Sequence, residues 1–375
     1  MQQLTAVEAR RMRLVAQGLD RRARAGADDG SAASRGASRG SSAGGGAGGA
    51  ASALGRTPTQ VVRRMVAMQG QDLLQVLQAI AIRSAPGTSL DDVRAVFDRG
   101  ELVRSWAMRG TLFVATPDAL ASLHAAVAGR MRTREWRMCL DRGIDEAAAE
   151  RSAAVLVELL ADAPQPRPAL MAAWEAAGID VSGGRGYHLL ALHSYAGLVR
   201  FGPFAGTAQL LVGGAAPAVQ GPDAALAEAV RSLVAARAPV SEADIAWWLA
   251  LPKSTVRAAF ARAEGIREVL VGGAPMLVVE QGLEGRRSGV LLVPGFDEWI
   301  LGYRDRSLTA GAEMHAALVP GNNGVFQPAV LVDGRAVGRW RAARGRGAPT
   351  VELIEQVSAA TAAAIERHVA AWPHG

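Results

Sequence analysis

The 375-residue chain is half apolar and one-fifth charged, and Cys139 is its single cysteine. This composition is that of a globular protein, and the length predicts roughly two to four compact units. One cysteine excludes internal disulfides and a cysteine-rich zinc finger. The sequence has no apolar run long enough to cross a bilayer and no signal-peptide core, so we expect a cytoplasmic protein with no membrane partner.

The charge balance favours a polyanionic partner, although only weakly. Lysine and arginine exceed aspartate and glutamate by 41 minus 35, or +6, and the pI is near 10.4. Lys253 is the only lysine, so the positive charge is almost wholly arginine. Arginine suits bidentate contact with phosphates and base edges, whereas a mildly basic total can also serve solubility alone.

Residues 1–145 form the first predicted domain, with a low-complexity stretch inside it. Residues 25–54 are mostly Gly, Ser and Ala with scattered Arg, and they cannot bury enough apolar surface to offset their ordering entropy. We therefore predict a flexible insert. The remainder predicts two helices around residues 68–72, a third at Leu90–Phe97, and a hairpin whose strands flank Arg109-Gly110.

The outline of three helices and a hairpin is that of a winged helix, and it recurs twice. The second predicted domain, 146–222, has helical periodicity in three segments and a hairpin around residues 198–212. The third, 223–284, has a capping-box pattern at Ser241–Asp244, a further helix after Pro252, and a hairpin turning at Gly272-Gly273. Residues 285–375 are rich in strands and Gly turns. They predict a small β-barrel followed by a helix from Val351 to Ala371.

A pair of glutamines lies at a predicted helix junction in the first domain. Gln69 and Gln71 flank Gly70, and Asp72 follows them, between two apolar stretches with helical spacing. Glutamines at helix ends usually cap the helix or face water, so this motif by itself does not establish chemistry.

Other candidate sites are weaker. His188 and His193 are five residues apart, whereas zinc pairs on one helix lie four apart, so we predict no metal and no cofactor. Asp297 and Glu298 are adjacent, and on a strand they would face opposite sides and could not act as a catalytic pair. Four arginines surround Trp136, and such a cluster is either a solvated face or a phosphate contact; they are Arg130, Arg132, Arg134 and Arg137.

Two C-terminal segments are specific. Residues 294–306, Pro-Gly-Phe-Asp-Glu-Trp-Ile-Leu-Gly-Tyr-Arg-Asp-Arg, and residues 320–326, Pro-Gly-Asn-Asn-Gly-Val-Phe, resemble motifs of the winged-helix DNA glycosylase family that includes AlkZ and YcaQ. Residues 106–112, Trp-Ala-Met-Arg-Gly-Thr-Leu, are similar to the Arg-Gly-Thr hairpin of that family. Gln69-Gly70-Gln71-Asp72 corresponds to its catalytic Gln-x-Gln or Gln-x-Asp motif. The chain departs from the family at Gly70, usually apolar, and at Phe113, commonly His.

The resemblance implies an α+β fold, a C-shaped array of tandem winged helices closed by the β-barrel. It implies a monomeric DNA glycosylase acting on double-stranded DNA with alkylated bases, and the second glutamine indicates the AlkZ-like branch, associated with self-resistance to genotoxic natural products and with cross-link unhooking. Gln69 and Gln71 would be catalytic, with Asp72 as a helper or merely a helix cap. We expect arginines to contact DNA at six positions: Arg104, Arg109, Arg130, Arg134, Arg304 and Arg306.

The chemistry of the residues fits one class of substrate. A glutamine amide takes no proton at neutral pH and can only orient water and present its dipole. That suffices when the base leaves readily, as an N7-alkylated guanine does because it is already cationic. Two rivals remain: a winged-helix DNA-binding regulator without catalysis, and a protein that sequesters the free toxin.

Overall fold

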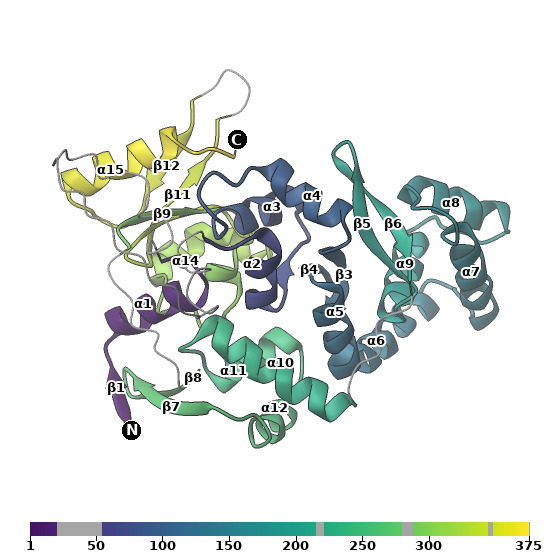
Figure 1. The fold of residues 1–375 in the computed structure, drawn as a ribbon, viewed down its shortest axis with the longest axis horizontal. Coiled ribbons are helices and arrows are strands. Elements are labelled where there is room, and N and C mark those ends of the chain that lie inside the picture. The colour runs from purple at the N-terminus through teal and green to yellow at the C-terminus, as the bar shows by residue number, and fades with distance from the viewer. Residues whose placement is uncertain (21–54, 215–220, 280–287, 344–347, 375) are drawn as a thin grey trace, which may run out of the picture.

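The structure is a computed structural model that describes residues 1–20, 55–214, 221–279, 288–343 and 348–374. The predicted insert at 25–54 therefore lies outside the described residues. The fold is mixed α+β, as predicted (Figure 1). The three predicted domains, residues 1–145, 146–222 and 223–284, are called the first, second and third units below. The helices in the first two units are α1 (Ala6–Ala16), α2 (Pro58–Met65), α3 (Leu73–Ala81), α4 (Leu90–Asp98), α5 (Pro117–Leu123), the π-helix η3 (His124–Ala128), α6 (Gly129–Leu140), α7 (Glu146–Leu159), α8 (Arg167–Ala176) and α9 (Arg185–Tyr195). The later helices are α10 (Pro222–Arg237), α11 (Glu242–Leu249), α12 (Lys253–Phe260), α13 (Glu298–Leu301), α14 (Ala312–Leu318), the 3₁₀ turn η4 (Pro320–Asn322) and α15 (Ala359–Ala370).

The first unit contains the predicted three helices and hairpin. Capping boxes at Thr57 and Ser89 start α2 and α4, because each side chain accepts from the third backbone N–H of its helix. Strands β3 (Val103–Met108) and β4 (Thr111–Ala115) then pair antiparallel. Arg109 and Gly110 form the turn with φ of 60° and 76°, the two positive values that a tight hairpin turn requires.

A five-stranded antiparallel sheet joins the hairpins of the first two units. Its order is β2-β4-β3-β5-β6, where β2 is Met68–Gln69, β5 is Val199–Ala205 and β6 is Ala208–Gly213. The sequence predicted two separate hairpins and no strand at residues 68–69. The result is that Gln69 lies on an edge strand, paired in register with Phe113.

The third unit also has the expected capping box, with Ser241 capping α11, and the expected hairpin. Its strands are β7 (Ile266–Val271) and β8 (Ala274–Val279), and β1 (Gln2–Leu4) adds parallel to β7. The long helix α10, which the sequence did not predict, packs against η3, α2 and α12. It brings the third unit against the glutamine-bearing first unit.

The predicted C-terminal β-barrel is wrong for the part of this region that the structure describes. Four antiparallel strands form an open sheet in the order β12-β11-β10-β9, with β9 (Val290–Val293) and β12 (Thr350–Leu353) at its edges. The inner strands are β10 (Ala329–Val332) and β11 (Arg335–Arg341). Helices α15 and α14 pack on β9 and β11, so helices rather than further strands bury its apolar faces.

The terminal helix begins later than predicted. Residues 350–353 pair with β11 as strand β12, and the helix starts only after Ser358, whose side chain caps it. The alanine-rich stretch begins only at Ala359, and residues 350–353 before it pair with β11 instead of extending the helix.

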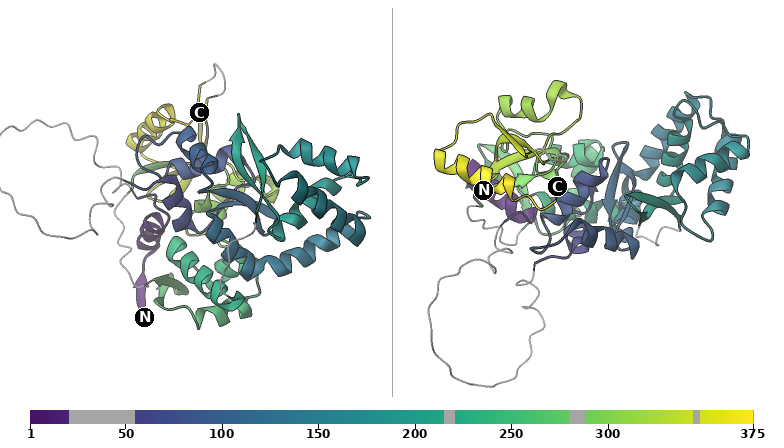
Figure 2. Two further views of the ribbon diagram at one scale, coloured as in Figure 1. Left: turned by 45° about the vertical axis from the view of Figure 1, so that its right-hand side comes forward. Right: turned by 90° about the horizontal axis from the view of Figure 1, so that it is seen from above.

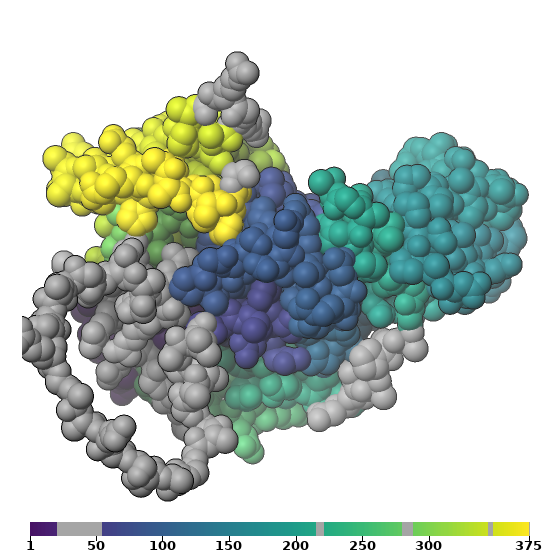
Figure 3. All heavy atoms as spheres, turned by 45° about the horizontal axis from the view of Figure 1, so that its top comes forward, coloured from purple at the N-terminus to yellow at the C-terminus, as the bar shows by residue number. Residues whose placement is uncertain are grey.

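The first unit occupies the middle of the molecule. The C-terminal sheet lies on one side of it and the second unit, α7 to α9, projects on the other (Figures 1 and 2). The space-filling view shows the first unit exposed between these two flanks (Figure 3). No helix among the described residues is long and apolar enough to cross a membrane.

Candidate active site

The two glutamine amides are oriented by backbone donors. The Gln69 Oε1 atom accepts from the backbone N–H of Gln71 at 3.0 Å, and the Gln71 Oε1 atom accepts from the backbone N–H of Leu112 at 3.2 Å. A backbone N–H can only donate, so the atom facing it in each amide must be the oxygen. The –NH₂ groups and one lone pair of each carbonyl are then available to a ligand or to water. Gln69 is buried and Gln71 is exposed.

Gly70 is held by hydrogen bonds to both its N–H and its carbonyl. Its N–H donates to Leu112 O at 2.8 Å, and its carbonyl accepts from Arg104 Nε at 2.6 Å. A Cβ at this position would lie 3.2 Å from Val114 Cγ2, so the neighbouring strand closes tightly on the glycine. The departure at Gly70 therefore gives a close backbone approach in this chain.

The predicted site residues Arg104 and Asp72 have partners within the motif. Besides the Gly70 carbonyl, Arg104 donates to Gln209 Oε1 on β6 at 3.2 Å, and burial lowers the pKa of its guanidinium to about 10. It stays charged at neutral pH and joins the motif to the second unit. Asp72 is the N-cap of α3, with Oδ1 accepting from Gln75 N at 3.1 Å. Its carboxylate is exposed and lies close enough to Arg104 to favour the charged guanidinium.

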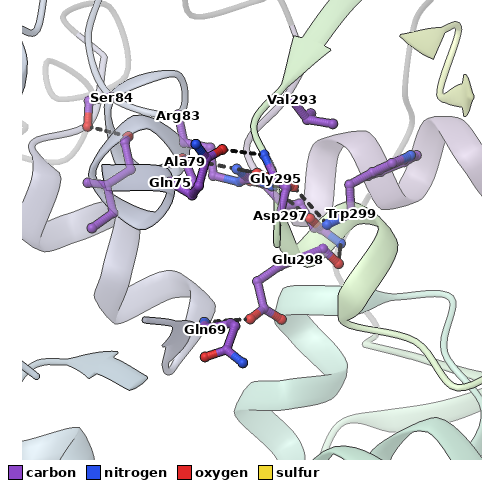
Figure 4. A network of polar contacts seen from close by, with 12 residues as sticks. Gln69, Gln75, Ala79, Arg83, Ser84, Val293, Gly295, Asp297, Glu298 and Trp299 are labelled. Carbon is purple, nitrogen blue, oxygen red and sulfur yellow. Dashed lines mark hydrogen bonds and ion pairs between the residues drawn. The ribbon is translucent and has the colours of Figure 1, made fainter. Parts of the chain in front are cut away.

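A buried ion pair holds the outer edge of strand β2. Glu298 Oε1 accepts from the backbone N–H of Gln69 at 2.8 Å, while its Oε2 binds Arg237 Nη2 at 2.9 Å and Trp248 Nε1 at 3.2 Å. Arg237 in turn donates to the carbonyls of Met65 and Ala67. The other edge of β2 is paired with β4, so backbone groups on both sides of the strand that carries Gln69 are bonded. Figure 4 shows Glu298 reaching the backbone of Gln69 while the Gln69 amide points away.

Glu298 and Asp297 were expected on a strand, and that prediction is wrong. Asp297 caps the short helix α13 and Glu298 is its first residue. They are still no catalytic pair, because each has its own cation: Asp297 forms two hydrogen bonds with Arg83, at 2.7 and 2.8 Å, and Glu298 binds Arg237. All four side chains of these two pairs are almost completely buried.

The residues around the glutamines that the sequence did not single out come from distant segments. Glu298 is 229 positions from Gln69 along the chain, and Gln75, which accepts from Gly295 N, links α3 to the same C-terminal segment (Figure 4). The only sequence signal was the resemblance of residues 294–306 to a family motif. The structure shows what this segment does: it holds the glutamine strand in place.

The departure at Phe113 lies in the core. Phe113 is fully buried and packs edge-on against Trp248, with ring centroids 5.6 Å apart. This aromatic pair supports the indole that donates to Glu298. The presence of Phe rather than His at position 113 therefore affects the buried packing that supports the glutamine motif and not its exposed surface.

Two of the predicted DNA-contacting arginines meet on one indole. The guanidinium carbon of Arg109 lies 3.8 Å from the centroid of the Trp247 ring, and that of Arg306 lies 5.6 Å from it. Arg306 also lies 4.9 Å from the centroid of Phe326 and donates from Nε to Ile300 O. Among the described residues, neither guanidinium has a carboxylate within ion-pair distance.

The other predicted arginines are exposed. Arg130 and Arg134 lie on α6 and line a hollow of about 470 Å³ together with Arg137. Positions 130, 134 and 137 fall on one face of the helix. Arg134 lies beside the turn of the β3–β4 hairpin, since a Cβ added to Gly110 would be 3.9 Å from its Nη1 atom. Arg304 is exposed, and its backbone N–H donates to Asp244.

The histidines are used in packing contacts between helices. His188 Nδ1 is 2.6 Å from Glu135 Oε1, and His193 Nε2 is 2.7 Å from Ser152 Oγ. Burial lowers the pKa of His193 to about 4, so its ring is neutral at neutral pH. No cluster of three or more His, Cys, Asp or Glu side chains that could hold a metal occurs in the described parts of the chain.

Comparison with known proteins gives the class. The family model described as AlkZ-like DNA glycosylase matches residues 62–373, which include the glutamine motif and almost all of the described fold. The chain therefore belongs to the AlkZ-like DNA glycosylase family and is an enzyme of that class.

One solved structure gives the likeness in three dimensions. The chain is similar to Streptomyces sahachiroi DNA glycosylase AlkZ, with a TM-score of 0.70 at 21% identity, over 84% of this chain and 90% of that one. At this identity the likeness shows the fold. No match was found among the curated proteins.

Proposed function

We propose that this enzyme hydrolyses the N-glycosidic bond of cationic, N7-alkylguanine-type bases in double-stranded DNA. The observation that carries the proposal is that the carboxylates near the two amides are already engaged by other groups of the protein. Glu298 is buried and bound to Arg237, and Asp72 caps α3. The groups left to face a substrate are the amides of Gln69 and Gln71, neither of which can accept a proton at neutral pH.

Neutral amides suffice only for a base that departs without help. When the C1′–N9 bond of an N7-alkylated guanosine breaks, the bonding electrons neutralise the base, and the sugar takes oxocarbenium character. Water then adds to C1′ and its proton passes to solvent. The –NH₂ donors and remaining carbonyl lone pairs of Gln69 and Gln71 would orient that water and place dipoles near the developing charge. Asp72 would contribute as the N-cap of α3, which orders the segment after the glutamines, and not as a base.

The proposed DNA contacts follow the arginines of the first unit and of the C-terminal region. We propose that the three helix-and-hairpin units, residues 1–145, 146–222 and 223–284, act as winged-helix modules in a C-shaped, monomeric array that holds the duplex. Arg109, Arg130, Arg134, Arg304 and Arg306 would contact phosphates. Arg104 would act mainly by holding the carbonyl of Gly70, because its donors already have partners. We also propose that the enzyme unhooks interstrand cross-links and serves in self-resistance to alkylating natural products. It would act in the cytoplasm and at the nucleoid.

The affinity for duplex DNA should fall steeply with salt. Each arginine that neutralises a phosphate releases condensed counterions, so about five such contacts predict a slope near −4 to −5 in log K against log salt. Fluorescence anisotropy with lesion-free duplex from low to physiological ionic strength measures the slope. A slope near zero would contradict phosphate contact and favour a protein that sequesters free toxin.

Base release separates the proposed enzyme from its rivals. Duplex carrying one N7-methylguanine, incubated with excess enzyme, should lose the base well above the spontaneous rate. A DNA-binding regulator would bind the duplex and release nothing. The structure favours no second function by any specific contact.

A further inference from the structure

Arg109 occupies a conformation that is unfavourable for its residue type. Its φ of 60° is in the left-handed region, where residues other than Gly, Asn and Asp are uncommon. The hairpin turn needs positive φ here, and asparagine or glycine would supply it at lower cost. Backbone strain of this kind is found where the side chain has a task.

The Arg109 guanidinium is also unsatisfied. Its Nη1 atom is buried and has no hydrogen-bond partner within the described structure. Burial lowers the pKa of this guanidinium to about 10, Glu298 opposes that shift, and Arg306 adds to it. The group is therefore a half-buried cation at neutral pH, with a second cation nearby and a donor directed at no acceptor. A buried charged donor without an acceptor is costly unless a ligand completes it.

Trp247 holds the two cations in place. Stacking on an indole occupies the face of a planar guanidinium and leaves its N–H edge free to donate. Arg109 lies against this ring at 3.8 Å from its centroid, and Arg306 lies 5.6 Å from the same centroid, between Trp247 and Phe326. Trp247 is itself packed against the core that includes the third unit. The two side chains come from the hairpin turn and from the segment after α13, so Trp247 fixes donors from distant segments against one another.

The stack adjoins the catalytic motif. Leu112, which holds the Gln71 amide, follows Arg109 by three residues in the same hairpin. Glu298, which holds the backbone of Gln69, is the acidic group that acts on Arg109. An anion bound between the two guanidiniums would lie beside the glutamines.

We propose that Arg109, stacked on Trp247, and Arg306, held between Trp247 and Phe326, form a preformed site for one phosphate of the DNA strand that carries the damaged base. The inference rests on the proposed function and deepens it. It makes these two arginines a single clamp that places the damaged nucleotide before Gln69 and Gln71, with Trp247 as a positioning residue.

A cycle of changes in protein and DNA tests the clamp. Methylphosphonates, which remove the charge of one phosphate, are placed singly at each position flanking an N7-methylguanine. At one position the dissociation constant of wild-type enzyme should rise on the order of 10- to 100-fold, the loss of a charge-assisted contact. In Arg109→Met and in Arg306→Met the same methylphosphonate should cost less than in the wild-type enzyme, because one of the two partners of the phosphate is already gone, and in the Arg109→Met/Arg306→Met double variant it should cost less than about twofold.

The control is Arg257→Met. Arg257 is exposed on α12, close in sequence to Trp247, and both of its bonds go to the Glu242 carboxylate. This variant should keep the wild-type penalty at every position. Thermal unfolding of Arg109→Met should occur near the wild-type temperature, because the change removes a half-buried cation with an unsatisfied donor along with its stacking contact on Trp247. Trp247→Leu should weaken binding as the arginine changes do, and Trp247→Phe should retain most of it.

The outcomes separate the clamp from the catalytic proposal. The clamp would be overturned if the methylphosphonate raised the dissociation constant of both arginine variants by the same factor as that of the wild-type enzyme, at every position. It would also be overturned if Trp247→Leu bound the duplex as tightly as the wild-type enzyme. Base release is measured in the same samples. Its absence from wild-type enzyme would contradict the proposed function, while coupling in the dissociation constant would still support the clamp.

Discussion

Glu298→Ala is expected to destabilise the folded protein by about 3–5 kcal/mol, the usual loss when one partner of a buried ion pair is removed. Arg237 is fully buried, and without Glu298 its charge would keep two carbonyls and the Trp248 ring as partners but lose its carboxylate. Trp248 Nε1 and the N–H of Gln69 would lose their acceptor as well. Urea or thermal unfolding of purified protein measures the loss.

Two companion variants separate stability from the positioning of Gln69. Glu298→Gln keeps an acceptor for Gln69 N and should retain more base release per folded molecule than Glu298→Ala. The double variant Glu298→Leu/Arg237→Met removes both charges and should recover most of the lost stability, since paired apolar replacements are often neutral or better. It should not recover the rate, because the edge of β2 is no longer bonded. Recovery of both would show that the ion pair serves folding alone.

Gln71→Ala should lower single-turnover base release on the order of 10- to 1,000-fold, by analogy with the loss of one preorganised dipole. Gln71 is exposed, and within the described parts of the chain its amide is bonded to Leu112 N alone, so folding should be unaffected. DNA affinity should stay within about a few-fold of wild type, because an amide that orients water acts in the transition state.

Gln71→Glu is the matched control for the Gln71 prediction. It keeps the acceptor for Leu112 N and adds a charge where the proposal needs none. A Gln71→Ala variant with the wild-type rate would place the chemistry elsewhere, and the Gln69→Ala/Gln71→Ala double variant extends the test to the pair.

Local chemistry made parts of the fold predictable. The Arg109-Gly110 hairpin, the Ser241 capping box and the Gly272-Gly273 turn are set by residues within a few positions of one another, and the structure has all three. The motif around Gln69 could be singled out only through its resemblance to a family. Its spacing alone is equally typical of a helix cap, and Asp72 does cap α3.

The rest depended on contacts between distant segments. Nothing near Glu298 in the sequence indicates that its partners are Gln69 and Arg237, and the assumption of a strand gave the wrong geometry for residues 297–298. The merging of two hairpins into one sheet through Arg104 and Phe201 has no local signal either. The strand-rich pattern of the C-terminal region predicts a barrel because the sequence does not show whether the two outer strands pair with each other or, as here, remain the edges of an open sheet.

The most direct test of the catalytic account compares two bases in matched duplexes under single-turnover conditions. One duplex carries N7-methylguanine and the other uracil at the same position, and released base is quantified against time. Two neutral amides should release the cationic N7-methylguanine and leave uracil in place, because uracil departs as an anion and needs more stabilisation than an amide provides. Release of uracil at the rate of N7-methylguanine would contradict the account.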